Sequence, residues 1–267
     1  MAREVIDRRE GRSLFGSDPA AYDAARPGHA ERVYEVLVER CRLHPGARVL
    51  EIGPGTGQAT RRLLELGARP LVAIEPDPAL AQYLARSLGT QVDIRVVALE
   101  DAVLADGSFD LAAAASSFHW VDEAVGLARV FETLRPGGWA ALWWTLFGSE
   151  ERDAFMRAID PLFEDLPVSP SHGGKGRSYF GVDSEARMAA LEAAGFAEVD
   201  HEVFAWTAGW DTNGIRTLYG TFSPIAVLDE ARRARILDGI AAIAERDFGG
   251  HVERTLRTSF FSARKPT

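Results

Sequence analysis

A glycine-rich loop lies between a short apolar run and a helix, and its residue types suit the binding of a ligand. The run at 49–52 is predicted as a buried strand, and the loop after it consists of Gly53, Pro54, Gly55, Thr56, Gly57 and Gln58. Glycines at a strand-to-helix turn let backbone N–H groups approach a ligand at the carboxyl edge of a parallel sheet. The same glycines could instead form a tight structural turn that binds nothing.

An acidic residue beside this loop indicates which ligand would suit it. Glu51 lies at the end of the predicted strand. Its negative charge would repel the pyrophosphate that a dinucleotide places at a helix N-terminus. A ligand that carries a sulfonium and an ammonium, and no phosphate, would be attracted to the same place. S-adenosylmethionine (SAM) is such a ligand, so Glu51 and the loop favour SAM over NAD.

Two further acidic stretches follow the next two predicted strands. Glu75 and Pro76 end the strand at 71–74, where a carboxylate can accept both hydrogen bonds from a ribose diol. This spacing also occurs in NAD enzymes, so it does not separate the two cofactors. After the strand at 92–97, an acid could accept from an adenine amino group while a backbone N–H meets a ring nitrogen, or it could cap a surface helix. The candidates there are Leu99, Glu100 and Asp101.

One histidine is the first candidate for proton transfer. His119 follows the predicted strand at 109–114, at the carboxyl edge where an acceptor would meet a cofactor. An ordinary imidazole titrates near neutral pH, which suits a general base. The alternative is an imidazole that packs beside Trp120 and forms structural hydrogen bonds. The sequence shows no Ser-His-Asp set and no metal-ligand cluster with convincing spacing, so we expect no metal.

The elements that would position these residues alternate along the chain. Apolar runs at 49–52, 71–74, 92–97, 109–114 and 139–144 alternate with helical patterns at 29–43, 58–66, 78–88 and 122–134. This order predicts an α/β fold with a parallel sheet covered by helices. A helix at 184–194, edge strands at 198–206 and 253–263, and a helical segment between those strands complete the pattern. We expect an arm over the site (1–28), a SAM-binding domain (29–206 and 251–267) and a helical cap (207–250).

The composition indicates an ordinary globular chain of 267 residues, with 46% hydrophobic and 26% charged residues. The formal net charge is -9 and no stretch concentrates Lys and Arg, which argues against a nucleic-acid partner. The single Cys41 argues against a disulfide framework and a cysteine cluster for zinc. No targeting segment and no apolar run of about 18 to 20 residues is visible, so we expect a cytoplasmic protein that does not enter a membrane.

These residues together resemble the class I SAM-dependent methyltransferases of the methyltransferase type 11 group. The resemblance covers residues 15–144 and rests on four motifs: EIGPGTG (51–57), AIEPDP (73–78), DGSFDLAAAASSFHWVD (106–122) and LRPGGWAALWW (134–144). One departure is Ala98, which stands where the group often has an acid, so the adenine contact shifts toward Glu100. A narrower similarity to trans-aconitate methyltransferase-like proteins rests on Phe15, Tyr22, Arg26-Pro27, Phe118-His119-Trp120 and Thr221-Phe222-Ser223-Pro224.

The resemblance implies a Rossmann-like sheet of seven strands in the order 3-2-1-4-5-7-6, with the last strand antiparallel. It implies transfer of a methyl group from SAM to a small-molecule acceptor by in-line displacement, with release of S-adenosylhomocysteine, by a monomer or homodimer. Ser116 and Ser117 would contact the methionine portion of SAM, and Trp120 would form a wall of the site. Tyr22 and Arg26 would fold over the cofactor, with Arg26 binding the SAM carboxylate or an acidic substrate.

Two other functions stay open from the sequence. A SAM-binding regulator without catalytic activity would carry the same motifs. A nicotinamide-dependent oxidoreductase is disfavoured by Glu51 and by the GxGxG spacing, since dinucleotide sites prefer GxGxxG. A glycine-rich loop beyond residue 170 could be a positively charged flap or a solvated connector (His172, Lys175, Arg177, Tyr179). Several aromatic residues could line an acceptor pocket or belong to the core (Trp143, Trp144, Trp206, Trp210, Tyr219, Phe222).

Overall fold

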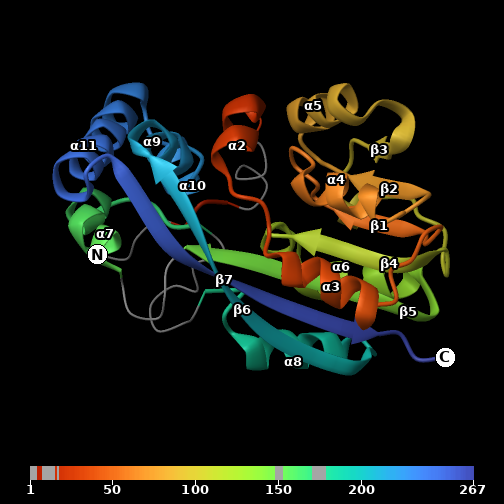
Figure 1. Ribbon diagram of the computed structural model, residues 1–267. Helices are drawn as coiled ribbons and strands as arrows, with labels where there is room; N and C mark the ends of the chain where they lie inside the picture. Colours follow the sequence, from red (N-terminus) through yellow and green to blue (C-terminus); the bar gives the residue numbers. More distant parts are fainter. Residues whose placement is uncertain (1–4, 8–15, 17, 148–152, 170–178) are drawn as a thin grey trace.

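The computed structural model describes residues 5–7, 16, 18–147, 153–169 and 179–267. Its centre is a seven-stranded sheet in the order β3-β2-β1-β4-β5-β7-β6 (Figure 1). The strands are β1 Val49–Ile52, β2 Leu71–Ile74, β3 Asp93–Arg95, β4 Phe109–Ala115, β5 Leu134–Phe147, β6 Ala197–Asp211 and β7 His251–Arg264. The first five are parallel, and β7 is antiparallel to both of its neighbours, β5 and β6. The predicted fold class and strand order are therefore confirmed.

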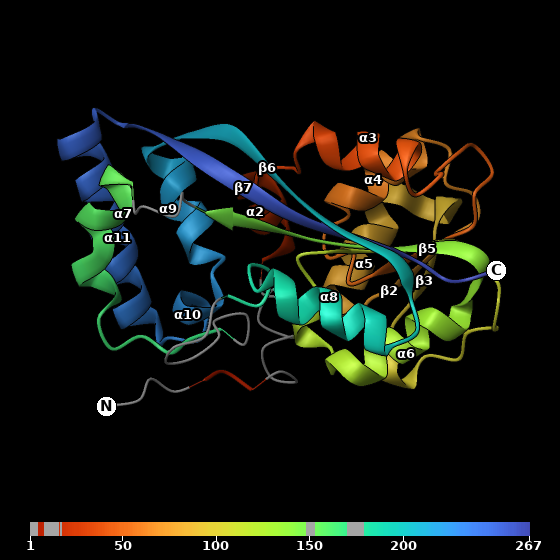
Figure 2. The ribbon, with the colours of Figure 1, turned by 90° about the horizontal axis from the view of Figure 1, so that it is seen from below.

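Helices cover both faces of the sheet because its central strands are apolar on both sides. One face packs against α3 (Glu31–Glu39), α4 (Gln58–Glu65) and α5 (Pro78–Leu88). The other packs against α6 (Glu123–Thr133) and α8 (Ser184–Ala193), as Figure 2 shows from below. Successive residues of β1 alternate between these faces, with Val49 in the first core and Leu50 in the second. The carboxyl ends of the parallel strands therefore meet at one edge of a two-sided core.

Aspartates begin helices next to this edge. Asp77, Asp122 and Asp211 each accept a hydrogen bond from a backbone N–H in the first turn of α5, α6 and α9 (Thr212–Gly220). Such a cap satisfies a donor that has no partner inside the helix, and its loss costs about 0.5–2 kcal/mol. The ends of these helices are thus fixed by local side chains.

A further helical layer, the cap, lies beyond the carboxyl edge of the sheet. It contains α9, α10 (Ser223–Ala226) and α11 (Glu230–Phe248), which lie between β6 and β7 (Figure 1). Helix α7 (Ala154–Ile159) joins it, because Phe155 and Ile159 are buried in the same apolar cluster. The observed cap differs from the predicted segment (207–250) in two ways. It begins later, because β6 continues to Asp211, and it includes α7, which the predicted range leaves out. The six residues of α7 are too few to show a helical period in the sequence.

The arm connects the cap to the sheet domain. Its helix α2 (Pro19–Ala25) lies between the cap and α5 in Figure 1. On the sheet side, Gln58 Nε2 donates to the Arg26 carbonyl at 2.8 Å. On the cap side, Trp210 Nε1 donates to the Ala25 carbonyl at 3.0 Å. The arm thus ties the cap to the helix that follows the glycine loop. Phe15, which contributes to the narrower similarity, lies outside the described residues.

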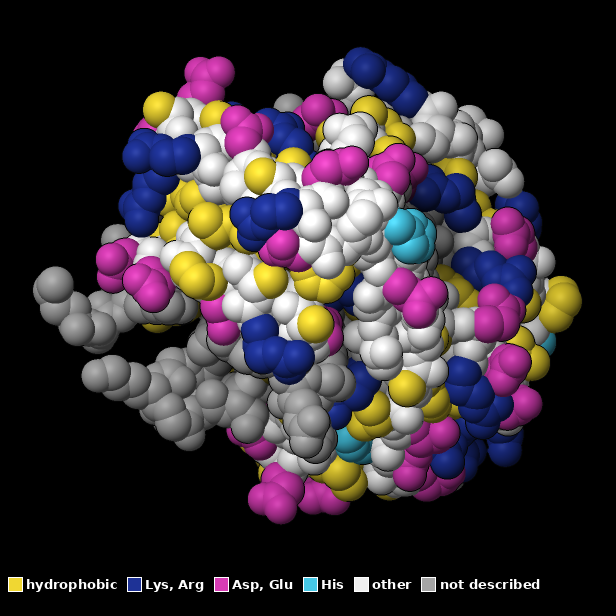
Figure 3. Space-filling view, turned by 60° about the vertical axis from the view of Figure 1, so that its left-hand side comes forward, with side chains coloured by type: hydrophobic (Ala, Val, Ile, Leu, Met, Phe, Trp, Pro, Cys, Tyr) yellow, Lys and Arg dark blue, Asp and Glu magenta, His cyan; other side chains and the backbone are white. Residues whose placement is uncertain are grey.

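The surface carries charged side chains of both signs, and Figure 3 shows acidic and basic residues intermingled on one face. That face shows no continuous basic patch of the kind that binds a nucleic-acid backbone. Within the described residues, no helix combines the length and the apolar character needed to cross a membrane. The same part of the chain holds no group of three or more His, Cys, Asp or Glu side chains placed to bind a metal ion.

Candidate active site

Glycines of the loop adopt backbone conformations that other residues rarely adopt. Gly53 and Gly55 have φ of 64° and 58°, in the left-handed region. A Cβ on Gly53 would lie 2.6 Å from Ser117 Cβ, whereas a Cβ on Gly55 would meet no atom within 4 Å. Gly57 has a different role, because a Cβ there would lie 2.4 Å from Leu84 of α5. Gly55 therefore presents bare backbone to open space, whereas Gly53 permits close packing against Ser117 and Gly57 permits close helix packing.

Glu75 fixes the shape of this loop. Its side chain is 4% exposed and accepts hydrogen bonds from the backbone N–H groups of Gly55 (3.0 Å) and Asp77 (2.9 Å). A carboxylate has about four acceptor sites, so these two bonds are compatible with further bonds from ribose hydroxyls. The predicted ribose-binding residue is thus held rigidly at the end of β2.

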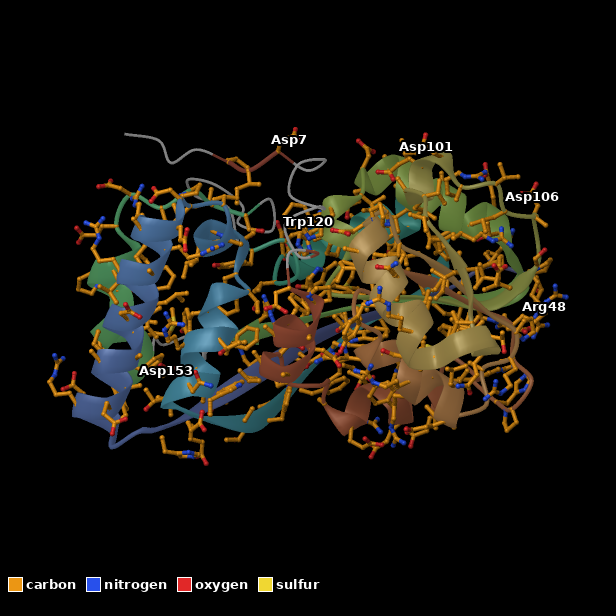
Figure 4. The ribbon with its side chains drawn as sticks, turned by 90° about the horizontal axis from the view of Figure 1, so that it is seen from above. Asp7, Arg48, Asp101, Asp106, Trp120 and Asp153 are labelled. Atoms are coloured by element: carbon orange, nitrogen blue, oxygen red, sulfur yellow. The ribbon has the colours of Figure 1, made fainter. Side chains whose placement is uncertain are left out.

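A cavity of about 590 Å³ lies between the sheet edge, the arm and the cap. This volume is in the range of about 300–1,000 Å³ that is usual for small-molecule sites. Figure 4 places Trp120 at the junction between the sheet domain and the cap. The cavity brings together most of the predicted site residues: Tyr22, Arg26, Gly53, Pro54, Gly55, Gln58, Glu75, Pro76, Leu99, Ser116, Ser117, His119 and Trp120.

The structure separates the three residues that were predicted to contact adenine. Leu99 is buried and lines the cavity, but Glu100 and Asp101 do not line it. Glu100 accepts from the backbone N–H of Asp122 at 3.3 Å, and Asp101 is exposed at the periphery of the sheet domain (Figure 4). The three residues form a short 3₁₀ turn, in which Leu99 is buried, Glu100 is half-buried and Asp101 is exposed. Of this stretch, Leu99 alone reaches the site within the described structure.

Glu51 lies at the base of the loop and is 1% exposed. Among the described residues, neither of its carboxylate oxygens has a hydrogen-bond partner. Burial raises the pKa of Glu51 to about 7; the nearby Thr60 hydroxyl and Arg61 partly oppose this shift, and the charge of Glu75 adds to it. A buried carboxylate without hydrogen bonds is costly when ionised, and a positively charged ligand nearby would offset that cost.

His119 is held by a hydrogen bond whose direction fixes the position of its proton. Trp144 Nε1, which can only donate, lies 3.1 Å from Nδ1 of His119, and both side chains are buried. Nδ1 must therefore accept, which leaves the single proton of the neutral ring on Nε2. The ring also packs against Trp120, with 5.0 Å between centroids. In this state His119 can donate from Nε2 but cannot accept a proton there, so the geometry favours the structural alternative.

Comparison with known proteins supplies the family. Residues 50–142 match the family described as methyltransferase domain. The malonyl-acyl-carrier-protein O-methyltransferase of Geobacter sulfurreducens is 30% identical over 206 residues, which are 73% of this chain and 73% of that protein. The chain belongs to the class I SAM-dependent methyltransferases. An uncharacterised methyltransferase of Mycobacterium tuberculosis is 34% identical over 158 residues, which are 59% of this chain and 62% of the mycobacterial protein, less than two thirds of its length.

Solved structures of low identity share the methyltransferase fold. Phosphoethanolamine N-methyltransferase 2 of Haemonchus contortus, in complex with phosphomonomethylethanolamine and S-adenosylhomocysteine, has a TM-score of 0.60 at 15% identity. The match covers 98% of this chain and 61% of that one. The cyclase SpnF has a TM-score of 0.58 at 20% identity, with 100% of both chains covered. A shared fold therefore does not decide the reaction, which must be argued from the site.

The cavity of this methyltransferase fits SAM, the cofactor of the family. Glu75 can accept from a ribose diol, and the bare backbone at Gly55 leaves room for the ligand. Glu51 does not line the cavity, and its predicted contact with the positive charge of SAM stays a prediction. Glu75 and the open backbone at Gly55 thus suit a ligand that carries a ribose.

Ser116 and Ser117 join the ends of three strands beside the loop. Ser117 Oγ donates to the Ile52 carbonyl at 2.5 Å, and Ser116 Oγ accepts from the Thr145 N–H at 3.3 Å. Ser116 also has φ of 53°, which is uncommon for a residue with a side chain. Both serines line the cavity, and their contact with the methionine portion of SAM stays a prediction.

Arg26 reaches from the arm to the cap. Its Nε donates to Thr221 Oγ1 at 2.8 Å, and its Cζ lies 4.7 to 5.5 Å from the ring centroids of Tyr22, Phe147 and Phe222. Burial lowers the pKa of Arg26, with Tyr22 acting in the opposite direction. No carboxylate of the described residues forms an ion pair with it. An anionic group on a ligand could therefore form an ion pair with this buried guanidinium.

Several cavity residues gave no signal in the sequence. Arg254 of β7 is 1% exposed, pairs with Asp153 at 2.9 Å and donates to the Tyr219 hydroxyl at 2.8 Å. Asp153 lies on the cap side in Figure 4, and it precedes Arg254 by 101 residues in the sequence. His29 and Thr145 line the cavity as well. Their roles depend on contacts between distant segments, which no local pattern reveals.

The predicted flap and aromatic pocket divide in the structure. Tyr179 lines the cavity, whereas His172, Lys175 and Arg177 lie outside the described residues. Among the aromatic candidates, Trp144, Tyr219 and Phe222 line the cavity. The other three candidates pack in apolar clusters without lining it: Trp143, Trp206 and Trp210.

Proposed function

We propose that this protein transfers a methyl group from SAM to a small-molecule acceptor that carries an anionic group. The observation that carries the proposal is a single cavity with two unlike ends. Its sheet side holds the glycine loop and Glu75, and its cap side holds aromatic rings around the Arg26 guanidinium. A cofactor and an acceptor bound at these two ends would meet beside the carboxyl ends of β4 and β5.

When bound, SAM supplies a methyl group on a sulfonium sulfur, which is an excellent leaving group, so the protein mainly has to align and enclose the reactants. Glu75 and the glycine loop would orient the adenosine end, and the negative charge of Glu51 would favour the sulfonium and the ammonium of the ligand. Arg26 would hold the anionic group of the acceptor while Phe147 and Phe222 pack against the apolar part. The arm, bonded to both the sheet domain and the cap, would exclude water from the cavity.

The acidic acceptor has support from two further directions. The Geobacter sulfurreducens relative is named for a malonyl group, which bears a carboxylate. The narrower similarity to trans-aconitate methyltransferase-like proteins points the same way and stays a prediction. The oligomeric state, monomer or homodimer, and the cytoplasmic location also stay predictions.

The competing role for Arg26 is binding of the SAM carboxylate. Calorimetry separates the two, because 5′-methylthioadenosine lacks the amino-acid portion of S-adenosylhomocysteine. If Arg26 binds the acceptor, Arg26→Met leaves the affinity for both ligands unchanged. A selective loss of S-adenosylhomocysteine affinity assigns Arg26 to the cofactor instead.

The function is tested by measuring S-adenosylhomocysteine release with a panel of acceptors, each anionic compound paired with its neutral amide or ester. We expect turnover of anionic members by the wild type, and a fall in their kcat/KM of about 10- to 100-fold in Arg26→Met, as for a lost charge-assisted hydrogen bond. The control is Arg32→Met, an exposed arginine of α3 that pairs with Glu35, which should leave turnover unchanged. Equal turnover of the charged and neutral partners would contradict the anionic acceptor.

A further inference from the structure

His29 stands at an unusual place on the cavity wall. It lies between the arm and α3, lines the cavity, and packs its ring edge-on against Trp143, with 5.6 Å between centroids and 89° between planes. Trp143 is completely buried, so this contact holds the imidazole in place. His29 is therefore a fixed ring on the cavity wall.

Neither ring nitrogen of His29 forms a hydrogen bond with the described residues. Nδ1 is enclosed and has no partner, and Nε2 has none either. Thr145, at the carboxyl end of β5, also lines the cavity, and its buried Oγ1 has no partner. Its backbone N–H is held by Ser116 Oγ, so the side chain stands at a fixed position. Buried polar atoms in proteins are nearly always hydrogen-bonded, so two such groups on one cavity wall point to a ligand that completes them.

The imidazole of His29 is neutral at pH 7. Burial lowers its pKa to about 4, and no charged side chain contributes to the shift. A neutral imidazole keeps one nitrogen lone pair, and no protein partner dictates which nitrogen carries the proton. His119 differs, because its Nδ1 lone pair is already used by Trp144.

We propose that His29, together with Thr145, binds the hydroxyl nucleophile of the methyl acceptor and takes up its proton during methyl transfer. This proposal rests on the proposed function and adds the residue that receives the proton. The nucleophile forms a bond to the methyl carbon, and the carbon–sulfur bond breaks with its electron pair retained by sulfur. The proton of the nucleophile passes to the free nitrogen of His29 and afterwards to solvent. The anionic group held by Arg26 is then a separate part of the acceptor.

A weak base is sufficient for this step with an oxygen nucleophile. The proton on a hydroxyl oxygen becomes strongly acidic as the oxygen–carbon bond forms, so even an imidazole of lowered basicity can receive it. Thr145 Oγ1 would accept from or donate to the same group and fix its direction. The two side chains together would align the nucleophile, and His29 would accept its proton.

The test is chemical rescue of His29→Ala. The reaction uses the full chain, SAM, and the hydroxyl acceptor with the highest turnover in the panel above. We expect kcat to fall about 10²- to 10⁴-fold, the usual contribution of general base catalysis, while calorimetry shows the affinity for S-adenosylhomocysteine within threefold of wild type. Imidazole in the buffer should restore at least tenfold in rate, whereas pyrrole, which has the same shape and no basic nitrogen, should not.

Control variants separate chemistry from packing. His44→Ala removes an exposed histidine outside the cavity, which contacts the Pro45 carbonyl, and should behave as wild type with and without imidazole. Thr145→Val keeps the shape of the side chain and should lower kcat about 5- to 20-fold, as for loss of one hydrogen bond. His29→Gln provides a second variant with a polar side chain if His29→Ala fails to fold, and its kcat should fall by at least tenfold.

Other outcomes overturn the proposal. Full turnover in His29→Ala, equal rescue by pyrrole, or methylation confined to carboxylate oxygens would each remove the role of proton acceptor. Loss of S-adenosylhomocysteine binding in His29→Ala would make His29 a cofactor-binding residue instead. Absence of turnover by the wild type with every acceptor would overturn the proposed function itself, which distinguishes the two failures.

Discussion

Two histidines face the cavity, and each packs against one of two consecutive tryptophans of β5. Trp143 and Trp144 point to opposite faces of the sheet, into the core under α3–α5 and the core under α6 and α8. Trp144 donates a hydrogen bond to His119, whereas Trp143 and His29 meet only through their rings. We call Trp144 and His119, which are joined by a hydrogen bond, the closed pair. We call Trp143 and His29, which meet only through their rings, the open pair.

This difference shows that lining a cavity does not settle the role of a histidine. In the closed pair, His119 has its lone pair occupied and its proton placed on Nε2. In the open pair, His29 has no hydrogen bond with the described residues and can respond to a ligand. The stability of variants should reveal the same division, since a closed pair contributes to folding and an open polar group does not.

The largest expected effect concerns Glu51, which shares the face of the open pair because it alternates with Leu50 along β1. The pKa of this carboxyl is 4.5 in the unfolded chain and about 7 in the fold. The folded state therefore holds the proton more tightly, so the contribution of Glu51 to stability is most favourable below pH 4.5, falls as the pH rises, and is least favourable above 7.

Glu51→Gln should remove this dependence. At pH 8 the ligand-free variant should be more stable than wild type by about 3 kcal/mol at most, with the difference shrinking toward pH 5. Urea unfolding at pH 5, 6, 7 and 8 measures the free energy of unfolding at each point. A variant that is less stable than wild type at pH 8 would show that the carboxylate is not isolated.

The next effect compares the two histidines directly. His119→Phe leaves the buried N–H of Trp144 without an acceptor and should lower the free energy of unfolding by about 1–3 kcal/mol. His29→Phe removes no hydrogen bond and should stay within about 0.5 kcal/mol of wild type. Urea unfolding of both variants at one pH is sufficient, and a larger loss for His29→Phe would reverse the assignment of closed and open pairs.

The smallest effect comes from the tryptophans. Trp143→Phe and Trp144→Phe remove similar buried volume, so most of the packing cost cancels between them. Trp144→Phe should cost about 1 kcal/mol more, because it also removes the hydrogen bond to His119. Equal free energies of unfolding for the two variants would indicate that this hydrogen bond contributes nothing to stability.

Local patterns in the sequence predict much of the sheet domain. The β/α alternation gives the parallel strands, and the family resemblance gives the strand order that the structure confirms. Gly53, Gly55 and Glu75 are also found from the sequence, because their function depends on one strand-to-helix turn and the end of the next strand. Elements that interact through neighbouring residues therefore leave readable signals.

Other site residues depend on distant contacts. His29 looks like the first residue of an amphipathic helix, and only its place beside Trp143 reveals a partnerless imidazole. The proton position of His119 follows from Trp144, which lies on another strand. Acids follow the third strand and predict adenine contacts at Glu100 and Asp101, but neither residue lines the cavity. Side-chain direction and partners between distant segments cannot be read from spacing.

The central claim is that the glycine loop and the cavity bind SAM, and one calorimetric titration with S-adenosylhomocysteine tests it most directly. Gly55→Arg places a long side chain in the cavity, and Gly89→Arg is a matched control, since Gly89 has φ of 57°, open space around its Cβ and no place on the cavity wall. Wild type and Gly89→Arg should bind one S-adenosylhomocysteine per chain, and Gly55→Arg should bind none while keeping its circular dichroism spectrum. Absence of binding by the wild type, or binding of NAD in its place, would contradict the account.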